Sequence, residues 1–318
     1  PAAANGRRGE AGADVLLGGA GNDTLNGGAG NDTLTGGTGA DSLTGGVGAS
    51  SMLDYAGMTT VAVVNLSGGT LSSVPTGTTR TSVNSSAVND TISGFEWFHL
   101  GTAGDIFYGS GTAERIEGGS GNDWLRGAGG ADTIIGGADM DTADYGEYGT
   151  AITVDILAGT ANDGTVTDVL YGIENINTGS GNDTVAGDSG NNSITANSGN
   201  DSVAGWAGND SLEGGAGIDT LDGGYGQDAI WGNSGTDLLI GGSDSDELYG
   251  GSENDTLLGG DGNDYLIGGD ESSNQYVSGG GNNSIDGGFG EDTIFGGDGN
   301  DSIYGGDGND YIGSIWGG

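Results

Sequence analysis

The 318-residue sequence has no cysteine, no lysine and a single histidine. The lack of cysteine excludes a disulfide framework and thiol chemistry, and one histidine, His99, leaves little room for histidine-based catalysis. Only five residues are basic, all of them arginine, so the clustered cations that bind the phosphates of nucleic acid are missing. The longest apolar run, Val61 to Val64, is far shorter than the roughly 20 residues that cross a bilayer. We therefore expect neither nucleic-acid binding nor membrane insertion.

Acidic residues and glycine make up much of the chain instead. The 46 aspartates and glutamates give a formal net charge of −41 at pH 7, which also disfavours docking on anionic membranes. The 76 glycines are close to a quarter of the residues, against a usual share of about 7%. A chain this rich in glycine and poor in hydrophobic residues is disordered unless its glycines follow a regular pattern.

The glycines and aspartates recur with a period of nine residues. The unit is Gly-Gly-x-Gly-x-Asp-x-U-x, where U is aliphatic, and residues 18–26 are a complete example. The array holds 24 such units, with one extra residue before the unit of Asn274. Four units carry Glu114, Asn192, Asn274 or Asn283 at the sixth position. The other 20 units carry aspartate there, namely Asp14, Asp23, Asp32, Asp41, Asp105, Asp123, Asp132, Asp141, Asp183, Asp201, Asp210, Asp219, Asp228, Asp237, Asp246, Asp255, Asp264, Asp292, Asp301 and Asp310.

Each part of the unit has a physical reason. The first six positions predict a tight turn, because glycine adopts positive φ without steric cost. Without Cβ atoms in the way, backbone carbonyls can point at a shared centre, and the aspartate adds a carboxylate to them. This all-oxygen donor set predicts a site for a hard cation. Calcium fits better than magnesium, because it accepts six or more oxygens at flexible angles.

The last three positions predict a short strand whose aliphatic side chain points inward while its neighbours point outward. Two nonapeptides that face each other would close one coil of 18 residues. The predicted core is a narrow ladder of aliphatic side chains between two parallel sheets. Members of this ladder include Leu16, Leu25, Leu34, Leu212, Leu221, Leu239, Leu257 and Ile303.

The repeat resembles that of the RTX, or hemolysin-type, calcium-binding proteins, whose nonapeptides form a parallel β-roll. The resemblance covers about two thirds of the chain and implies an all-β fold, a right-handed β-solenoid with 18 residues per coil. In that family calcium lies between successive turns on the same side of the roll. The resemblance therefore implies that the 20 aspartates named above bind calcium, on the order of 20 ions.

The same resemblance places the aspartates of the longest run along two edges of the roll. One edge is expected to hold Asp183, Asp201, Asp219, Asp237 and Asp255. The other edge is expected to hold Asp210, Asp228, Asp246 and Asp264. Asn192, Asn274 and Asn283 offer only a neutral oxygen, so we expect weaker or vacant calcium sites there.

The net charge supports a metal-binding role independently. Twenty carboxylates stacked along two edges would repel one another and destabilise a compact state. About 20 calcium ions would add about +40, which nearly cancels the charge of −41. If the acids only formed a solvated surface, they would have no reason to lie at the same position of each nine-residue unit.

Two stretches interrupt the repeats. The chain is thus predicted to divide into repeats at 1–48, a β-rich insert at 49–104, repeats at 105–137, a second insert at 138–182 and a long roll at 183–318. We expect both inserts to continue the roll rather than to form separate domains.

The two inserts are related by an internal duplication. Each opens with Asp-Tyr and ends with a strand and a Gly-x-Glu corner, at Glu96 in the first and Glu174 in the second. The first copy carries extra residues near 72–85, rich in serine and threonine, which predict an exposed loop. Glu96 and Glu174 are either calcium ligands or polar corners.

Enzymatic motifs are missing from the sequence. The zinc motif His-Glu-x-x-His needs two histidines, and a serine triad would need His99 as its base. His99 lies in the aromatic string 95–99, where a packed or surface role is expected. We therefore expect a protein that is not an enzyme.

Three functions fit these features. The first is an extracellular structural protein, a calcium-rigidified rod that serves as a filament subunit, surface-layer component or adhesin stalk. The second is an RTX secretion and folding module detached from a secreted enzyme, although such a tail rarely needs 24 repeats. The third is an ice-binding face, which would want threonine in register at the third position, where only Thr38 and Thr102 provide it. The first is favoured.

The calcium chemistry also predicts where the chain works and with what. Cytosolic calcium is too low to fill such sites, so we expect folding outside the cell, in a secreted or cell-surface protein of a bacterium. The repeats end without the polar capping unit that solenoids need, and no secretory signal opens the chain. We expect a processed piece or open ends that meet a second copy, with a surface glycan as a further candidate partner.

A lateral contact is predicted on the C-terminal half. The ninth position of each unit faces outward, and it is mostly polar or small before Asp222 but apolar afterwards. One sheet is predicted to present Trp231, Tyr249, Ile267 and Tyr304, and the opposite sheet Ile240, Leu258, Val277 and Phe295. Contiguous rows of this kind usually mark an interface. The alternative is that aromatic and β-branched residues simply favour strands.

Overall fold

The computed structural model describes residues 4–47, 50–59, 62–65, 90–269 and 281–313. Over these ranges the chain forms 32 short strands. The same ranges hold no helix long and apolar enough to cross a membrane.

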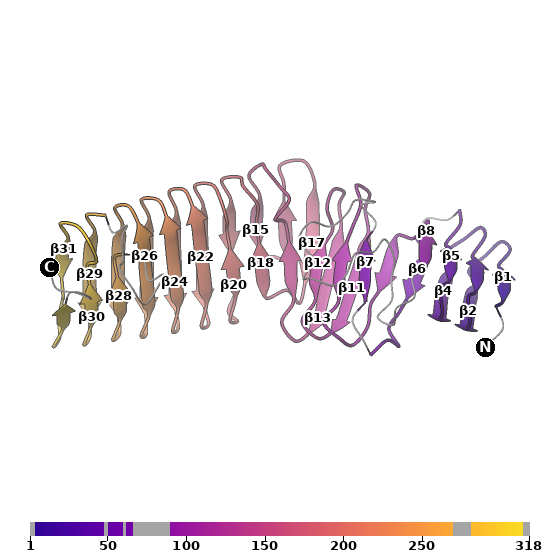
Figure 1. Cartoon of the computed structure of the whole chain (residues 1–318), viewed down its shortest axis with the longest axis horizontal. Helices are drawn as coiled ribbons and strands as arrows, with labels where there is room; N and C mark the ends of the chain where they lie inside the picture. Colours follow the sequence, from indigo (N-terminus) through magenta and orange to yellow (C-terminus); the bar gives the residue numbers. More distant parts are fainter. Residues whose placement is uncertain (1–3, 48–49, 60–61, 66–89, 270–280, 314–318) are drawn as a thin grey trace. The chain divides into compact units, whose positions relative to one another are not determined.

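Contact between strands divides the chain into two compact units. The first comprises Pro1–Asp144 and Val166–Ile173, and the second comprises Tyr145–Thr165 and Glu174–Gly318. Figure 1 shows the strands of each unit stacked one after another as the coils of a solenoid. The predicted all-β fold, a parallel β-solenoid, is confirmed.

The first unit is built from three rows of strands that pair in parallel. The hydrogen-bonded orders within it are β1-β3-β5-β8, β2-β4-β6-β9-β11-β13-β17 and β7-β10-β12-β14. The strands are β1 (Gly6–Arg8), β2 (Val15–Ala20), β3 (Thr24–Asn26), β4 (Thr33–Thr38), β5 (Ser42–Thr44), β6 (Met52–Asp54), β7 (Val63–Asn65), β8 (Thr91–Ser93), β9 (Trp97–His99), β10 (Ile106–Tyr108), β11 (Arg115–Ser120), β12 (Trp124–Arg126), β13 (Thr133–Ala138), β14 (Thr142–Asp144) and β17 (Thr167–Tyr171).

The second unit is built from two rows. Their orders are β16-β15-β19-β21-β23-β25-β27-β29-β31 and β18-β20-β22-β24-β26-β28-β30-β32. All described neighbours in these rows are parallel except β15 and β16, which form an antiparallel pair. The strands are β15 (Thr153–Asp155), β16 (Thr160–Asn162), β18 (Asn175–Asn177), β19 (Thr184–Ala186), β20 (Ser193–Thr195), β21 (Ser202–Ala207), β22 (Ser211–Ala216), β23 (Thr220–Tyr225), β24 (Ala229–Ser234), β25 (Leu238–Ser243), β26 (Glu247–Ser252), β27 (Thr256–Asp261), β28 (Tyr265–Ile267), β29 (Ser284–Phe289), β30 (Thr293–Phe295), β31 (Ser302–Tyr304) and β32 (Tyr311–Gly313).

The aliphatic residue of each repeat forms the core, as its alternation with polar residues predicts. Leu212 is in register with Ile230, and Ile230 with Leu248, one coil of 18 residues apart. All three side chains are fully buried. Each coil of the repeats therefore adds one aliphatic layer from either row, while Phe98, Phe107 and Tyr145 add buried aromatic rings within or beside the inserts.

One coil of the second unit is longer than expected. Thr256 is in register with Ser284, and the N–H of Asp255 donates to Oδ1 of Asn283, 28 residues further on. A count of consecutive units would place Asn274 after Asp255 on this edge, but Asn283 lies there, and Asn274 itself lies outside the described residues. Ladder hydrogen bonds link only directly adjacent strands, so ten extra residues lengthen a connection and leave the register intact.

The described strands of both inserts lie within the solenoid. In the first insert β6 pairs with β4 and β9, and β8 pairs with β5, all in parallel. In the second, β17 pairs with β13 and β15 pairs with β19. The predicted loop near 72–85 lies outside the described residues.

Candidate metal sites

The aspartate at the sixth position of each repeat enters the turn between two strands, and it is buried there. Oδ1 of Asp219 accepts the N–H of Asp201 at 2.8 Å, and Oδ1 of Asp237 accepts the N–H of Asp219 at 2.9 Å. Both carboxylates are at most 2% exposed. Each aspartate is thus tied to the same position one coil earlier, and the ladder continues along both edges of the second unit in the predicted order.

The second carboxylate oxygen has no such partner. Across the described residues, Oδ2 is buried without a hydrogen-bond donor in fifteen of the predicted aspartates. These are Asp23, Asp32, Asp41, Asp123, Asp132, Asp183, Asp201, Asp210, Asp219, Asp228, Asp237, Asp246, Asp255, Asp264 and Asp292. Leaving a buried charged oxygen unsatisfied is costly, so repetition of the same orphan at one position indicates a common missing ligand.

Glycine makes the space that this oxygen faces. A Cβ at Gly250 would lie 2.6 Å from Oδ2 of Asp255 and 2.6 Å from the carbonyl oxygen of Gly268 in the next coil. At Gly232 the corresponding distances are 2.6 Å to Asp237 and 2.5 Å to the carbonyl of Gly250. Two acceptors therefore face one small cradle. Only a cation or a proton donor placed between them can stabilise this arrangement.

Asparagine supplies the donor where it replaces aspartate. Nδ2 of Asn283 donates to the carbonyl oxygen of Gly296 at 3.1 Å, and it occupies the place beside Gly268 that Oδ2 takes at other repeats. Nδ2 of Asn192 donates to the carbonyl of Glu174 at 3.0 Å. Asn283 thus places a donor in the cradle, which supports the prediction of a weak or vacant calcium site there. At Asn192 the neutral Oδ1 lies beside Gly187 and accepts the N–H of Asp188 at 2.9 Å.

Burial and like charges act together on the aspartates. Burial, followed by the charges of Asp228 and Asp264, raises the pKa of Asp246 to about 8. The pKa of Asp255 rises to about 7 and that of Asp237 to about 6, again mainly through burial. A divalent cation in the cradle would oppose these shifts by favouring the ionised form. The carboxylate and carbonyl oxygens are hard donors, as calcium requires.

The cradles do not gather many acids. In the part of the chain that the structure describes, no three acidic or histidine side chains converge on one point. Each cradle instead offers one carboxylate oxygen with backbone carbonyls around it. Carbonyl-rich shells of this kind suit calcium, which accepts backbone oxygens in flexible geometry.

The protein-family comparison agrees with this geometry. The model of the RTX calcium-binding nonapeptide repeat, which spans four copies, matches residues 8–43, 26–49, 108–143, 177–212, 207–239, 240–272 and 277–312. The chain belongs to the RTX repeat family. RTX repeats bind calcium, so this is a calcium-binding protein, and proteins with such repeats are typically secreted by bacteria. No curated protein matched the chain.

Four of the 20 aspartates that resemble RTX ligands have other surroundings. Oδ2 of Asp105 accepts the N–H of Gly101 at 2.7 Å, and Oδ2 of Asp14 accepts that of Glu10 at 3.0 Å. Asp301 and Asp310 are partly exposed. Asp141 shares the common arrangement, because it is buried and its Oδ1 accepts the N–H of Asp123.

Two RTX ladder positions escaped the sequence pattern. Oδ1 of Asp90 accepts the N–H of Asp41, and Oδ1 of Asp168 accepts that of Asp132, both at 2.8 Å. Both begin the order Asp-x-U-x, Asp90 just before β8 and Asp168 within β17, but they lack the glycine pair, so only the second half of the motif could have revealed them. Oδ2 of Asp90 accepts the hydroxyl of Tyr55 at 2.7 Å, so this oxygen has a donor from the protein.

The corner glutamate of the first insert has a structural partner. Oε2 of Glu96 accepts the N–H of Ser51 at 3.1 Å. This contact supports the polar-corner alternative for Glu96. Glu174, the corresponding residue of the second insert, contributes its backbone carbonyl to Asn192.

The predicted lateral surface of the RTX roll needs correction. Phe295 on β30 is in register with Ile267 on β28, and therefore shares a row with Trp231 and Tyr249. Tyr304 lies on the opposite row. The two had been assigned to the wrong sheets, because the 28-residue coil displaces every later residue by half a coil relative to a continuous nine-residue count.

Part of that surface is also covered by its own neighbours. Tyr249 is 9% exposed and Ile267 only 2% exposed. The rings of Trp231 and Tyr249 stack with centroids 5.6 Å apart, and Tyr249 meets Tyr265 edge-on at 6.2 Å. Leu258 and Tyr304 are exposed, Ile240 is half-buried, and Val277 lies outside the described residues.

Proposed function

We propose that this protein is a secreted structural component whose roll is made rigid by calcium bound at the buried aspartates. The single observation that carries the proposal is the cradle in which Oδ2 and a carbonyl oxygen of the next coil face each other, as at Asp255 and Gly268. The fifteen aspartates with an orphaned Oδ2 are the proposed ligands. Calcium bound in a cradle would be the positively charged partner that neither oxygen finds within the protein.

The position of the cradle explains how calcium would stiffen the roll. Oδ1 of Asp255 binds the backbone of Asp237 in the preceding coil, while its Oδ2 faces the carbonyl of Gly268 in the following coil. A bound ion therefore connects three successive coils at one edge. Because the cradle exists only in the folded chain, the free energy of calcium binding becomes free energy of folding.

The number of cradles favours a filament, surface-layer or adhesin role over a detached secretion module. A folding tail needs few sites, whereas fifteen aspartates with an unsatisfied Oδ2, spread over two units, would stiffen most of the described chain when they bind calcium. We propose that the protein has no catalytic activity. The one histidine, His99, has Nδ1 3.5 Å from Oδ1 of Asp54, a half-exposed pair that fits a surface role.

Self-association is proposed through the exposed part of the lateral surface. Leu258 is 37% exposed and Tyr304 is 64% exposed, on the row that holds β27 and β31. Exposed aromatic and aliphatic side chains on a sheet face favour contact with a second copy. Tyr249 and Ile267 are too buried to contribute.

Electron microscopy with and without calcium tests the structural role. We expect regular fibres or sheets in millimolar calcium and none after chelation. The variant with Leu258→Ser and Tyr304→Ser should keep calcium-induced strand signal in circular dichroism and lose assembly. The matched control Ile218→Ser changes an exposed residue on a turn and should assemble normally. A protein that stays monomeric at all calcium concentrations would support the secretion-module alternative instead.

A further inference from the structure

Trp206 has the least expected backbone conformation on the surface of the second unit. It occupies the second position of its repeat, which is glycine in the repeats of Gly224, Gly242 and Gly260. Its φ is +77°, a left-handed value that is a genuine outlier for a bulky side chain. The side chain is 62% exposed, so internal packing does not compensate for the strain. Strain of this kind concentrates at functional positions.

A bare backbone track runs from Trp206 across the following coils. Trp206 is in register with Gly224, which continues through Gly242 and Gly260 to Gly288. None of these four glycines carries a side chain above the turn. The track is therefore flat, and it is open to a ligand that lies along the solenoid axis.

The neighbouring register row supplies side chains along one border of this track. The row runs Tyr225, Ser243, Asp261 and Phe289. Tyr225 is 69% exposed and Phe289 is 61% exposed. The two residues are three strands apart in the row. Since neighbouring strands lie about 4.8 Å apart, this separation is about 14 Å. Two exposed rings thus flank a hydroxyl and a carboxylate.

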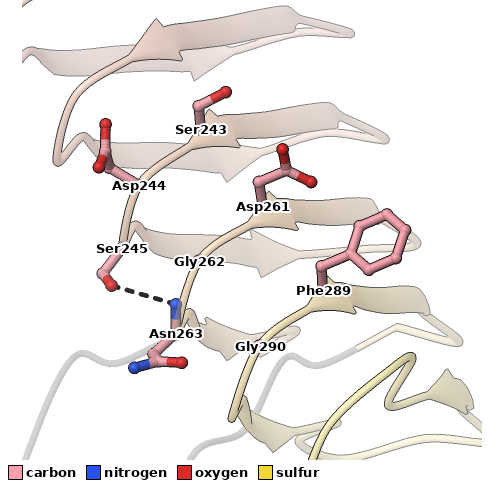
Figure 2. A pocket seen from close by; sticks show the side chains of 8 residues that line it. All are labelled: Ser243, Asp244, Ser245, Asp261, Gly262, Asn263, Phe289 and Gly290. Atoms are coloured by element: carbon pink, nitrogen blue, oxygen red, sulfur yellow. Dashed lines mark hydrogen bonds between the residues drawn. The ribbon is translucent and has the colours of Figure 1, made fainter.

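Beside Phe289 the edge has a shallow, open hollow. It has a volume of about 580 Å³, and its lining includes Ser243, Asp244, Ser245, Asp261 and Asn263. Figure 2 shows Asp261 beside Phe289, both projecting outward from adjacent strands. The N–H of Asn263 is already used by Oγ of Ser245 at 3.0 Å. The carboxylates of Asp244 and Asp261 are the acceptors that line the hollow.

We propose that this edge, from Trp206 to Phe289, binds a neutral extended oligosaccharide. Aromatic rings stack on the C–H faces of pyranose sugars, while carboxylates and hydroxyls bond to sugar hydroxyl groups. A protein partner would need one contiguous apolar core, but these rings are separated by polar groups. The carboxylates of Asp244 and Asp261 in the hollow repel anionic glycans. The inference goes beyond the structural role and does not depend on self-association.

The test measures binding of cellohexaose, chitohexaose and mannohexaose to the full chain in millimolar calcium by calorimetry. At least one of these neutral hexasaccharides should bind, and hexagalacturonate, an anionic probe, should not. Phe289→Ala and Tyr225→Ala should each weaken binding at least tenfold. Ile218→Ala removes an equally exposed apolar side chain (59% exposed) from the turn of the other edge, the edge of Asp219, and should leave affinity unchanged.

Trp206→Gly separates a binding role from a structural one. Glycine suits the positive φ at this position, so the variant should unfold at higher denaturant concentration than the parent, yet bind the hexasaccharide at least tenfold more weakly. Circular dichroism in calcium establishes folding, and electron microscopy reports assembly separately.

Three results would overturn the proposal. They are no binding of any neutral hexasaccharide by the folded protein, equal binding by all variants, or loss of self-association rather than of sugar binding in Phe289→Ala and Trp206→Gly. The last result would assign the edge to a second copy of the chain.

Discussion

The first unit and the roll of the second unit use one backbone ladder, but the coils beside the first insert satisfy some of its carboxylates in a different way. In the first unit, Oδ2 of Asp90 accepts a tyrosine hydroxyl, and both oxygens of Asp105 accept backbone N–H groups. In the second unit, from Asp201 to Asp264, every ladder aspartate keeps a buried Oδ2 without a donor. The comparison shows that a β-roll coil can be completed either by a donor from the protein or by a metal ion.

The one repeat of the first unit that carries glutamate instead of aspartate is also completed by donors from the protein. Glu114 stands where aspartate is usual, and its Oε1 accepts the hydroxyl of Thr112 at 2.8 Å and that of Ser110. A longer side chain reaches donors in its own turn. Insertions and substitutions therefore coincide with places where protein donors replace calcium, and these coils should depend on calcium least.

Removal of calcium should have the largest effect on stability. It should unfold the coils whose Oδ2 atoms lack a donor before the coils that protein donors complete. One site at a calcium concentration 100-fold above its Kd contributes about 2.7 kcal/mol, so loss of several sites exceeds the stability of most domains, about 5–15 kcal/mol. In hydrogen exchange, chelation should expose the amides of Asp201, Asp219 and Asp237 first. The amides of Asp41 and Ala62, which donate to Asp90 and Asp105, should retain protection longer. Unchanged protection at Asp219 would contradict the calcium assignment.

Acidification of calcium-free protein should restore part of the lost structure. Burial and like charges raise the pKa of Asp246 to about 8, of Asp255 to about 7 and of Asp237 to about 6, above the usual value of about 3.9 in an unfolded chain. The folded state therefore binds protons more readily. Its stability is fully present below about pH 4 and is lost as pH rises through 6 to 8. Circular dichroism of metal-free protein should show strand signal at pH 5 that disappears by pH 8.

Calcium should reverse this pH dependence. Protons and calcium compete for the same carboxylates, so the calcium concentration needed for folding should fall as pH rises from 5 to 8. A calcium midpoint independent of pH across this range would show that the raised carboxyls are not the ligands.

Substitution of one interior aspartate should destabilise the fold in calcium and stabilise it without calcium. In calcium, Asp237→Asn removes one ligand and should cost up to about 2.7 kcal/mol at 100-fold excess over Kd. Without calcium it removes a buried carboxyl with a raised pKa, so the pH at which the strand signal disappears should increase. The opposite change, Asn283→Asp, replaces an amide that bonds to Gly296 and should show both effects reversed. Equal losses in both conditions would indicate a purely structural hydrogen bond.

The smallest effect is expected where protein donors already complete the coil. Tyr55→Phe removes the hydroxyl that donates to Oδ2 of Asp90 and should cost about 1–3 kcal/mol. Because no metal is involved, the loss in chemical denaturation should be the same at 1 and 10 mM calcium. Tyr225→Phe is the matched control, because Tyr225 is 69% exposed. A loss that vanishes at high calcium would place an ion near Asp90.

Much of this architecture was predictable because the nine-residue period carries it. Glycine, aspartate and an aliphatic residue each have one conformational or chemical role in the unit. Their positions in the unit therefore predict which residues form the turn, the carboxylate ladder and the core. The pattern missed Asp90 and Asp168 because the ladder bond needs only a carboxylate oxygen, and both residues make it without the glycine pair. The partner of Asp90, Tyr55, is 35 residues away, beyond the reach of any local pattern.

Local periodicity is sufficient to predict the coil of 18 residues, the buried aliphatic ladder and the edges on which aspartates stand. The tertiary structure is needed to identify the carboxylates that remain without a donor and the outward residues that share a row after the 28-residue coil. It also decided that Trp206, Tyr225 and Phe289 border one glycine track. The physical reason is that register between coils depends on connection length and on hydrogen bonds between distant residues, which no single repeat contains.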